Sequence, residues 1–162
     1  MEKRPRIMGS GRYEFLKTII MANFKSDIVD IKFDIHTVFS KLSNPETLQS
    51  VADKLPSEAR QKIENISFSQ NSISVKANPV GEIKLEITER KEPVLIVFSA
   101  VTSPIPFKVL INLEDNGGNT TKAYADIDVE LNPFIKPMVQ GPLTEAAKKF
   151  GELLAIIPYG SI

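Results

Sequence analysis

Alternation of apolar and polar residues runs through the middle of the chain, between residues 66 and 131. Within it, residues 83–88, 107–113 and 123–131 carry an apolar side chain at every second position, which is the period of a half-buried β-strand. Short segments typical of turns separate the apolar runs, at 70–71, 78–81, 89–93 and 115–119. Because successive strands joined by short turns pair as antiparallel neighbours, we predict an antiparallel meander of six strands.

One strand of this meander is apolar at consecutive positions. Residues 94–101 predict a central strand with both faces covered, and residues 103–106, which contain two prolines, predict the break after it. The consecutive apolar residues leave the register of this strand open. The inward face consists either of Leu95, Val97 and Ser99 or of Ile96, Phe98 and Ala100.

Helices are predicted on both sides of the meander. Residues 24–33 alternate and predict a first strand, after which Asp34 is a favourable N-cap. Apolar residues at helical spacing then predict short helices at 35–42, 45–55 and 57–63. At the other end, Asn132 and Pro133 predict the start of a long helix toward Ile157, with a kink or restart at 141–142. Helices segregated from an antiparallel sheet define an α+β fold.

Three parts of the chain resemble one family of proteins. They are residues 35–44 (IHTVFSKLSN), the strand-rich middle, and residues 131–139 (LNPFIKPMV) with the Leu143 and Ala146-Ala147 that follow. Over residues 21–159 the chain resembles the helix-grip superfamily, also called SRPBCC or START-like, which includes the birch pollen allergen, START lipid-transfer domains and bacterial polyketide cyclase/dehydrase proteins. The resemblance implies a curved sheet of about seven strands around a long C-terminal helix, with two or three short helices after the first strand. It also implies an apolar cavity between sheet and helix.

The first twenty residues differ from the rest of the chain. They are basic and have no clean periodicity, so we expect residues 1–20 to be a disordered N-terminal extension. A cloning remnant, an upstream start codon and a native arm remain alternative origins. Residues 21–162 are then one helix-grip domain, as the length of 162 residues allows.

Composition narrows the classes of function. The absence of cysteine excludes a disulfide framework, a thiolate metal site and a cysteine nucleophile. A net charge of zero disfavours a dedicated nucleic-acid binder. No apolar run is long enough for a transmembrane helix, and the apolar stretch 15–24 is broken by Lys17 and lacks a cleavage site for a signal peptide. We therefore expect a cytoplasmic protein.

The sequence offers few groups for catalysis. His36 is the one histidine, at a helix start, and solvent exposure is its default. Asp126, Asp128 and Glu130 share the polar face of the last strand, which indicates a solvated face rather than a metal site. Gly117-Gly118 lacks the strand–loop–helix setting of a phosphate cradle. We expect no catalytic residue, no metal and no cofactor.

The expected site is therefore the cavity. Small residues on the last strand and the long helix either leave space there or allow close packing without a void. The predicted lining residues come from four strands and the long helix. They are Leu85, Val97, Ser99, Phe107, Val109, Ile111, Ala125, Ile127, Phe134, Met138, Ala146 and Phe150.

Three hypotheses of function follow. The first is a binding protein for an apolar small molecule or lipid. The second is an enzyme similar to polyketide cyclases, and the third is a partner-binding module with a filled core. The scarcity of polar groups near the cavity, at most Ser99, Thr102 and Tyr124, favours binding over catalysis. The oligomeric state stays open.

Overall fold

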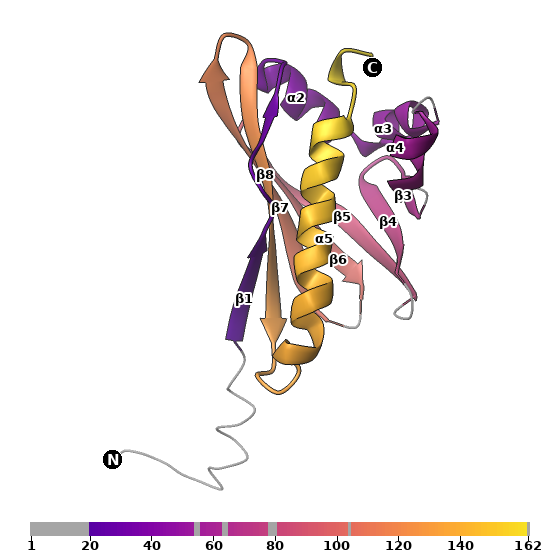
Figure 1. Cartoon of the computed structure of the whole chain (residues 1–162), viewed down its shortest axis with the longest axis vertical. Coiled ribbons are helices and arrows are strands. Elements are labelled where there is room, and N and C mark those ends of the chain that lie inside the picture. The colour runs from indigo at the N-terminus through magenta and orange to yellow at the C-terminus, as the bar shows by residue number, and fades with distance from the viewer. Residues whose placement is uncertain (1–19, 54–55, 63–64, 78–80, 104, 162) are drawn as a thin grey trace, which may run out of the picture.

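The structure, a computed structural model, describes residues 20–53, 56–62, 65–77, 81–103 and 105–161. An antiparallel sheet of eight strands curves around one long helix, and three short helices lie near the C-terminal end of that helix (Figure 1). The strands are β1 (Ile20–Lys25), β2 (Val29–Ile31), β3 (Ile66–Phe68), β4 (Ser72–Ala77), β5 (Gly81–Lys91), β6 (Leu95–Thr102), β7 (Phe107–Gly117) and β8 (Thr120–Leu131). The helices are α2 (Ile35–Leu42), α3 (Pro45–Ala52), α4 (Ser57–Lys62), α5 (Lys136–Ile156) and the short 3-10 helix η1 (Tyr159–Ser161).

The order of strands confirms the predicted meander. It runs β1-β8-β7-β6-β5-β4-β3, and β2 also pairs with β8. All pairings are antiparallel. The α+β architecture expected from the sequence, a curved antiparallel sheet around a long C-terminal helix, is therefore confirmed.

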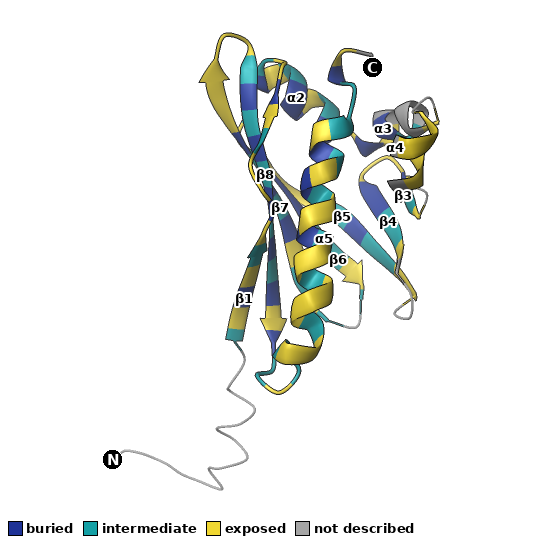
Figure 2. Cartoon of the chain, in the orientation of Figure 1, coloured by how far each residue is buried: buried dark blue, intermediate teal, exposed yellow. Residues whose placement is uncertain are grey.

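Burial alternates along β8 as the sequence predicts. Ala123, Ala125, Ile127, Val129 and Leu131 are each at most 1% exposed, because this face lies under α5 and its neighbours (Figure 2). The residues between them are half-buried or exposed. The hairpin before β8 is also as predicted: Gly117 and Gly118 have φ angles of 78° and 58°, a region that glycine enters without steric cost.

The predicted first strand is two strands. β1 pairs with the end of β8, β2 pairs with its beginning, and Ser26 lies in the break between them. Ser26 stays bound to β8, since its N–H donates to the carbonyl of Ala125 and its Oγ accepts from the N–H of Ala125, each at 2.8 Å. β1, the first described strand, begins at Ile20, one residue before the predicted start of the domain at residue 21. The rest of the predicted extension lies outside the described residues, as do residues 78–80 of a predicted turn.

The long helix begins later than predicted. The side chain of Asn132 caps the turn before it, accepting from the N–H of Phe134 at 2.8 Å, and the carbonyl of Asn132 accepts from Ile135 at 3.0 Å. The helix itself starts at Lys136, with Pro137 in its first turn. It continues through Pro142 to Ile156 without a restart, so that alternative was wrong.

Candidate functional site

An apolar cavity of about 30 Å³ lies between the C-terminal half of α5, the sheet and the wall formed by α2, α3, β3 and β4. Each of these elements contributes to its lining. The lining residues are Leu42, Leu48, Phe68, Ile73, Phe98, Ile111, Phe150, Leu153, Leu154 and Ile157. All are apolar, so among the described residues that line it the cavity has no group to donate or accept a proton.

The helix supplies one side of the cavity through its own periodicity. Phe150, Leu153, Leu154 and Ile157 follow the i, i+3, i+4, i+7 spacing that places side chains on one face of a helix. Phe150, Leu153 and Ile157 are half-buried, whereas Leu154 is 3% exposed. The cavity therefore lies just beneath the molecular surface.

Hydrogen bonds tie the opposite wall together. The N–H of Phe68 on β3 donates to Oε1 of Gln49 on α3 at 2.9 Å. Nη2 of Arg90 on β5 donates to the carbonyl of Ser43 at 3.0 Å and to Oδ1 of Asn71 at 2.8 Å. These bonds connect the helices to the β3–β4 hairpin, so the wall is attached to the sheet at its rim.

The cavity is small for a ligand site. Its volume of about 30 Å³ has room for one or two water molecules, but an apolar lining gives water no partners. Pockets for drug-sized ligands span ~300–1,000 Å³. A ligand of that size would have to move the wall of α3 and the β3–β4 hairpin away from α5.

Eight of the twelve predicted lining residues lie in or against the core. Leu85, Val109, Ile111, Ala125 and Ile127 are buried in the main core cluster. Phe107, Ala146 and Phe150 are partly buried against it. Of these eight, Ile111 and Phe150 line the cavity itself.

The register of β6 places Val97 and Ser99 away from the cavity. Ile96 and Phe98 belong to the core cluster under α5, so Val97 and Ser99 point to the outer face of the sheet. Oγ of Ser99 is 2.8 Å from Oγ1 of Thr88, in an exposed hydrogen bond. Of the two registers left open by the sequence, the structure has the one with Ile96 and Phe98 inward, so Val97 and Ser99 do not line this cavity.

Phe134 and Met138 also lie elsewhere. Their exposed fractions are 73% and 75%, so neither is enclosed between sheet and helix. Both were expected to line the cavity, but α5 begins at Lys136, after Phe134, and Met138 lies in its first turn. The cavity lies near the other end of α5, where Leu48, Phe68 and Ile73 close it.

The small residues near the middle of α5 serve close packing. Ala125 and Ala147 are fully buried, and a Cβ added to Gly151 would lie 2.7 Å from the Cβ of Ser26. The sequence left open whether the small residues leave space or allow close packing, and around Gly151 the structure has close packing.

The lining residues on α3, β3 and β4 were missed, because no sequence pattern indicates which helix and hairpin side chains meet across the chain.

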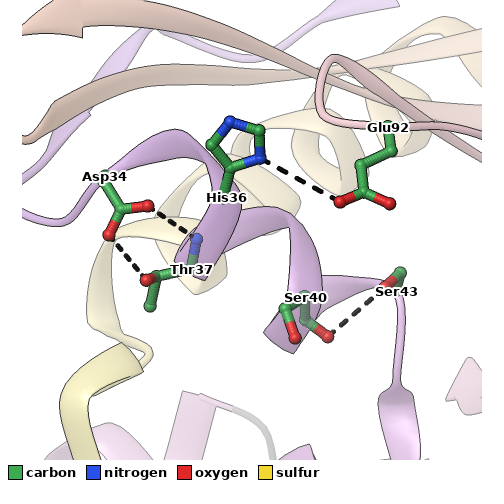
Figure 3. A network of polar contacts seen from close by, with 6 residues as sticks. All are labelled: Asp34, His36, Thr37, Ser40, Ser43 and Glu92. Carbon is green, nitrogen blue, oxygen red and sulfur yellow. Dashed lines mark hydrogen bonds and ion pairs between the residues drawn. The ribbon is translucent and has the colours of Figure 1, made fainter.

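His36 lies on the surface of α2 (Figure 3). Its Nδ1 is 4.0 Å from Oε2 of Glu92, and the two side chains are 68% and 69% exposed. The same helix is capped by Asp34, which accepts from Oγ1 of Thr37 at 2.6 Å and from its N–H at 3.1 Å. These hydrogen bonds hold the pKa of Asp34 below its ordinary value. His36 is not among the residues that line the cavity.

The carboxylates of β8 are engaged with neighbouring strands. Asp128 accepts from the side-chain amide of Asn23 at 2.6 Å, and Asp126 accepts from that of Asn112 at 3.1 Å. The described ranges contain no group of three or more His, Asp or Glu residues placed to hold a metal ion. In the same ranges no helix has the length and apolar character to cross a membrane.

Comparisons with solved structures place this architecture among known folds. Norcoclaurine synthase from Thalictrum flavum superposes with a TM-score of 0.62 at 12% identity, over 94% of this chain and 98% of that chain. The same enzyme has been solved in complex with dopamine and hydroxybenzaldehyde. A START superfamily protein from Mycobacterium smegmatis superposes with a TM-score of 0.51 at 14% identity, over 83% and 96% of the two chains. The chain has the START-like helix-grip fold.

A protein from Thermobifida fusca superposes with a TM-score of 0.58 at 9% identity, over 86% of this chain and 93% of that chain. No family model matches the sequence. No curated protein matches it either. In this START-like structure the cavity lies between the sheet and the long helix, which is where the resemblance seen in the sequence implied it.

Proposed function

We propose that this protein binds an apolar small molecule or a lipid chain in an expanded form of the cavity beside α5. The observation that carries the proposal is the lining itself: ten apolar side chains, from α2, α3, β3, β4, β6, β7, α5 and Ile157 just beyond α5, converge on one space. A ligand placed there would be surrounded mainly by apolar side chains. Burial of each methylene group contributes about 0.8 kcal/mol, so a chain of several carbons would bind without any polar anchor.

The wall opposite α5 is the part that would move. It is held by the Gln49–Phe68 bond and by the bonds of Arg90 to Ser43 and Asn71, which lie at its rim. Moving α3 and the β3–β4 hairpin outward would enlarge the space while leaving β6, β7 and β8 in place. Ligand binding then depends on an opening step, which predicts slow uptake relative to a preformed pocket.

Binding is favoured over catalysis by the same lining. A general acid or base must come within about 2.6–3.2 Å of the proton it transfers, directly or through one water. The described side chains that line the cavity contain no ionisable group, and His36 lies on the surface. The cyclase-like alternative has no observation of this kind in its favour.

The test is ligand detection in protein purified from cells without detergent. Native mass spectrometry should show an added mass that disappears on denaturation, and organic extraction should recover an apolar compound. A fluorescent fatty acid should then bind the emptied protein in a saturable way. Leu153→Trp, which fills the cavity from α5, should weaken that binding at least tenfold.

Ile156→Trp is the matched control, because Ile156 is also half-buried on α5 but does not line the cavity. Equal binding by the two variants would contradict a site in this cavity. A bare polypeptide mass together with no saturable uptake of any fatty acid or isoprenoid would overturn the proposal. The partner-binding module would then be the better hypothesis.

A further inference from the structure

The two ends of the sheet are protected to different degrees. At one end lies β3, which has three residues, and the N–H of its Phe68 donates to Oε1 of Gln49 at 2.9 Å. At the other end β1 and β2 both pair with β8. β1 has six residues, and in the described part of the chain β8 is the one strand that pairs with it (Figure 1). Of the three strands at the ends of the sheet, β1 therefore presents the longest unpaired edge.

The backbone groups of β1 alternate between β8 and this unpaired side. The N–H of Ser26 donates to the carbonyl of Ala125 at 2.8 Å, and the register of β1 with β8 leads directly to this pair. In an antiparallel ladder every second residue bonds to the neighbouring strand, and the residues between direct their N–H and C=O groups the other way. Three residues of β1 therefore direct their backbone donors and acceptors to the unpaired side: Met21, Asn23 and Lys25.

The side chains of β1 do little to block another strand. Edge strands are commonly protected by proline, by charged side chains or by a bulge. β1 has none of these before Lys25, its last residue, and its register with β8 is regular. Its outer face instead carries Met21, which is 65% exposed. The adjacent β2, by contrast, has three residues and contains Asp30, whose carboxylate lies 3.5 Å from the ammonium of Lys122.

From this edge we infer that β1 pairs antiparallel with β1 of a second copy of the chain, which joins the two sheets into one. A two-fold axis at Asn23 places residues 21, 23 and 25 of one copy opposite residues 25, 23 and 21 of the other. These are the residues that direct their backbone groups to the edge, so each opposed pair exchanges both of its hydrogen bonds. A register shifted by one residue would bring the buried face of one sheet level with the exposed face of the other.

The charges of the two copies suit this register. On the outer face Met21 lies opposite Lys25 of the second copy, and its neighbour on β8 is Glu130. Lys25 of one copy is therefore two strand spacings from Glu130 of the other, about 9–10 Å between backbones. Opposite charges thus lie on neighbouring positions across the axis, and no like charges lie directly opposite each other in β1.

The remaining side chains of β1 are also self-complementary. On the buried face Ala22 lies opposite Phe24 of the second copy, so a small side chain meets a large one. At the axis the side-chain amide of Asn23 donates to Asp128 at 2.6 Å. An amide has a second N–H and an acceptor oxygen, which allow it to bond to Asn23 of the second copy.

The interface is small and separate from the cavity. A pair of six-residue strands buries less than the ~1,200–2,000 Å² of a stable interface, so we expect a reversible dimer with a Kd of about 1–100 µM. No residue of β1 is among the described residues that line the cavity. The inference therefore does not rest on the ligand proposal, and each can fail without the other.

The experiment is sedimentation equilibrium of the full chain at concentrations from about 5 to 500 µM. The average mass should rise from the 18.0 kDa of one chain toward twice that value. Asn23→Pro removes an N–H at the axis but none that bonds to β8, so it should raise the Kd at least tenfold. Asn23→Ala is the matched control, because it also loses the bond to Asp128 but keeps the N–H. It should change the Kd less than threefold.

Disulfide trapping tests the register, because the chain has no cysteine of its own. Two residues of a bonded antiparallel pair have Cα atoms about 5.5 Å apart, which is within the range of a disulfide. Asn23→Cys should therefore give a covalent dimer on mild oxidation. Met21→Cys is the control, since position 21 is also exposed but lies about 13 Å along the strands from its own copy. It should stay monomeric on a denaturing gel.

Two kinds of result would overturn the inference. One is a constant monomer mass up to the highest concentration. The other is a dimer whose interface lies elsewhere, shown by equal Kd values for Asn23→Pro and Asn23→Ala or by equal trapping of the two cysteine variants. Circular dichroism checks that Asn23→Pro is folded, and the trapping experiment decides the question without that variant.

Discussion

Gly151 of α5 and Ser26 of the break between β1 and β2 approach so closely that neither can gain an atom toward the other. A Cβ on Gly151 would lie 2.7 Å from the Cβ of Ser26 and 3.0 Å from its Oγ. The same Ser26 is bound to β8 through both its N–H and its Oγ. This contact therefore fixes the distance between the long helix and the sheet at the middle of the fold.

Gly151→Ala should destabilise the protein. The added methyl group overlaps a side chain that is held in place by two hydrogen bonds, and overpacking of this kind costs about 1–3 kcal/mol. Gly141→Ala, in the same helix, is the matched control because nothing lies within 4 Å of the position its Cβ would take. That variant should be destabilised less than Gly151→Ala, because its methyl group meets no other element, and Pro142 next to it opposes the gain in helix propensity that alanine would otherwise give. Urea denaturation of the two variants measures both free energies, and destabilisation of equal size would contradict the contact.

A double variant separates overlap from lost propensity. Ser26→Gly removes the Cβ that meets the new methyl group, so Ser26→Gly/Gly151→Ala should be more stable than the sum of the single changes predicts. Ser26→Ala keeps the Cβ and should give no such rescue. Additivity of Ser26→Gly with Gly151→Ala would show that the cost of the alanine lies elsewhere.

The sequence predicted the parts of the fold that have one buried face. β8 alternates because α5 covers one side of it, and its hairpin carries glycines where positive φ angles are needed. β6 is apolar on both faces, so periodicity could not assign the directions of Val97 and Ser99. Nothing in the alternation of residues 24–33 indicates the break at Ser26, where the chain lies against Gly151, more than a hundred residues later in the sequence.

The cavity was predictable in its place but not in its residues. Phe150 was among the predicted lining residues, and Leu153, Leu154 and Ile157 follow it at the spacing that places side chains on one face of a helix. The residues that close the cavity from the other side belong to two helices and a hairpin. Their meeting depends on how those elements fold back over the sheet, and hydrophobic spacing within each element carries no information about that.

The register of β6 can be tested by cysteine labelling, because the chain has no cysteine of its own. Ser99→Cys should react with a thiol reagent at close to the rate of an unfolded control, since residue 99 lies on the outer face and is not enclosed. Ala125→Cys should be protected, because Ala125 is fully buried under α5. Protection of the thiol in the Ser99→Cys variant under native conditions would mean that the strand has the opposite register.

Tyr159 gives a prediction on alkaline stability. Its hydroxyl donates to the carbonyl of Leu154 at 2.7 Å, and burial raises the pKa of Tyr159 above its ordinary value of 10.0. As pH rises above 10, the unfolded tyrosine loses its proton while the folded one keeps it. The free energy of unfolding should therefore fall by about 1.4 kcal/mol per pH unit from this group.

Tyr159→Phe removes that dependence together with the hydrogen bond. At pH 7 the variant should be less stable by about 1 kcal/mol, because the carbonyl of Leu154 loses its partner. The two stability curves, measured by urea denaturation from pH 7 to 11, should meet at about pH 10–11. Parallel curves over that range would mean that Tyr159 ionises in the folded protein.

Enlarging the cavity tests whether its apolar space can hold a ligand without the wall moving far. Phe150→Ala removes a half-buried ring from the lining and should destabilise the protein by about 3 kcal/mol. Apolar cavities of about 150 Å³ stay dry and bind molecules of the size of benzene. Benzene should therefore raise the melting temperature of this variant, with the concentration dependence of a single site.

Phe107→Ala is the control, because Phe107 is also partly buried against the core but does not line the cavity. Stabilisation of Phe107→Ala by benzene to the same degree would assign the effect to general binding. If benzene left Phe150→Ala unaffected, the wall would have closed into the space, and a role for this cavity in binding would lose its main support.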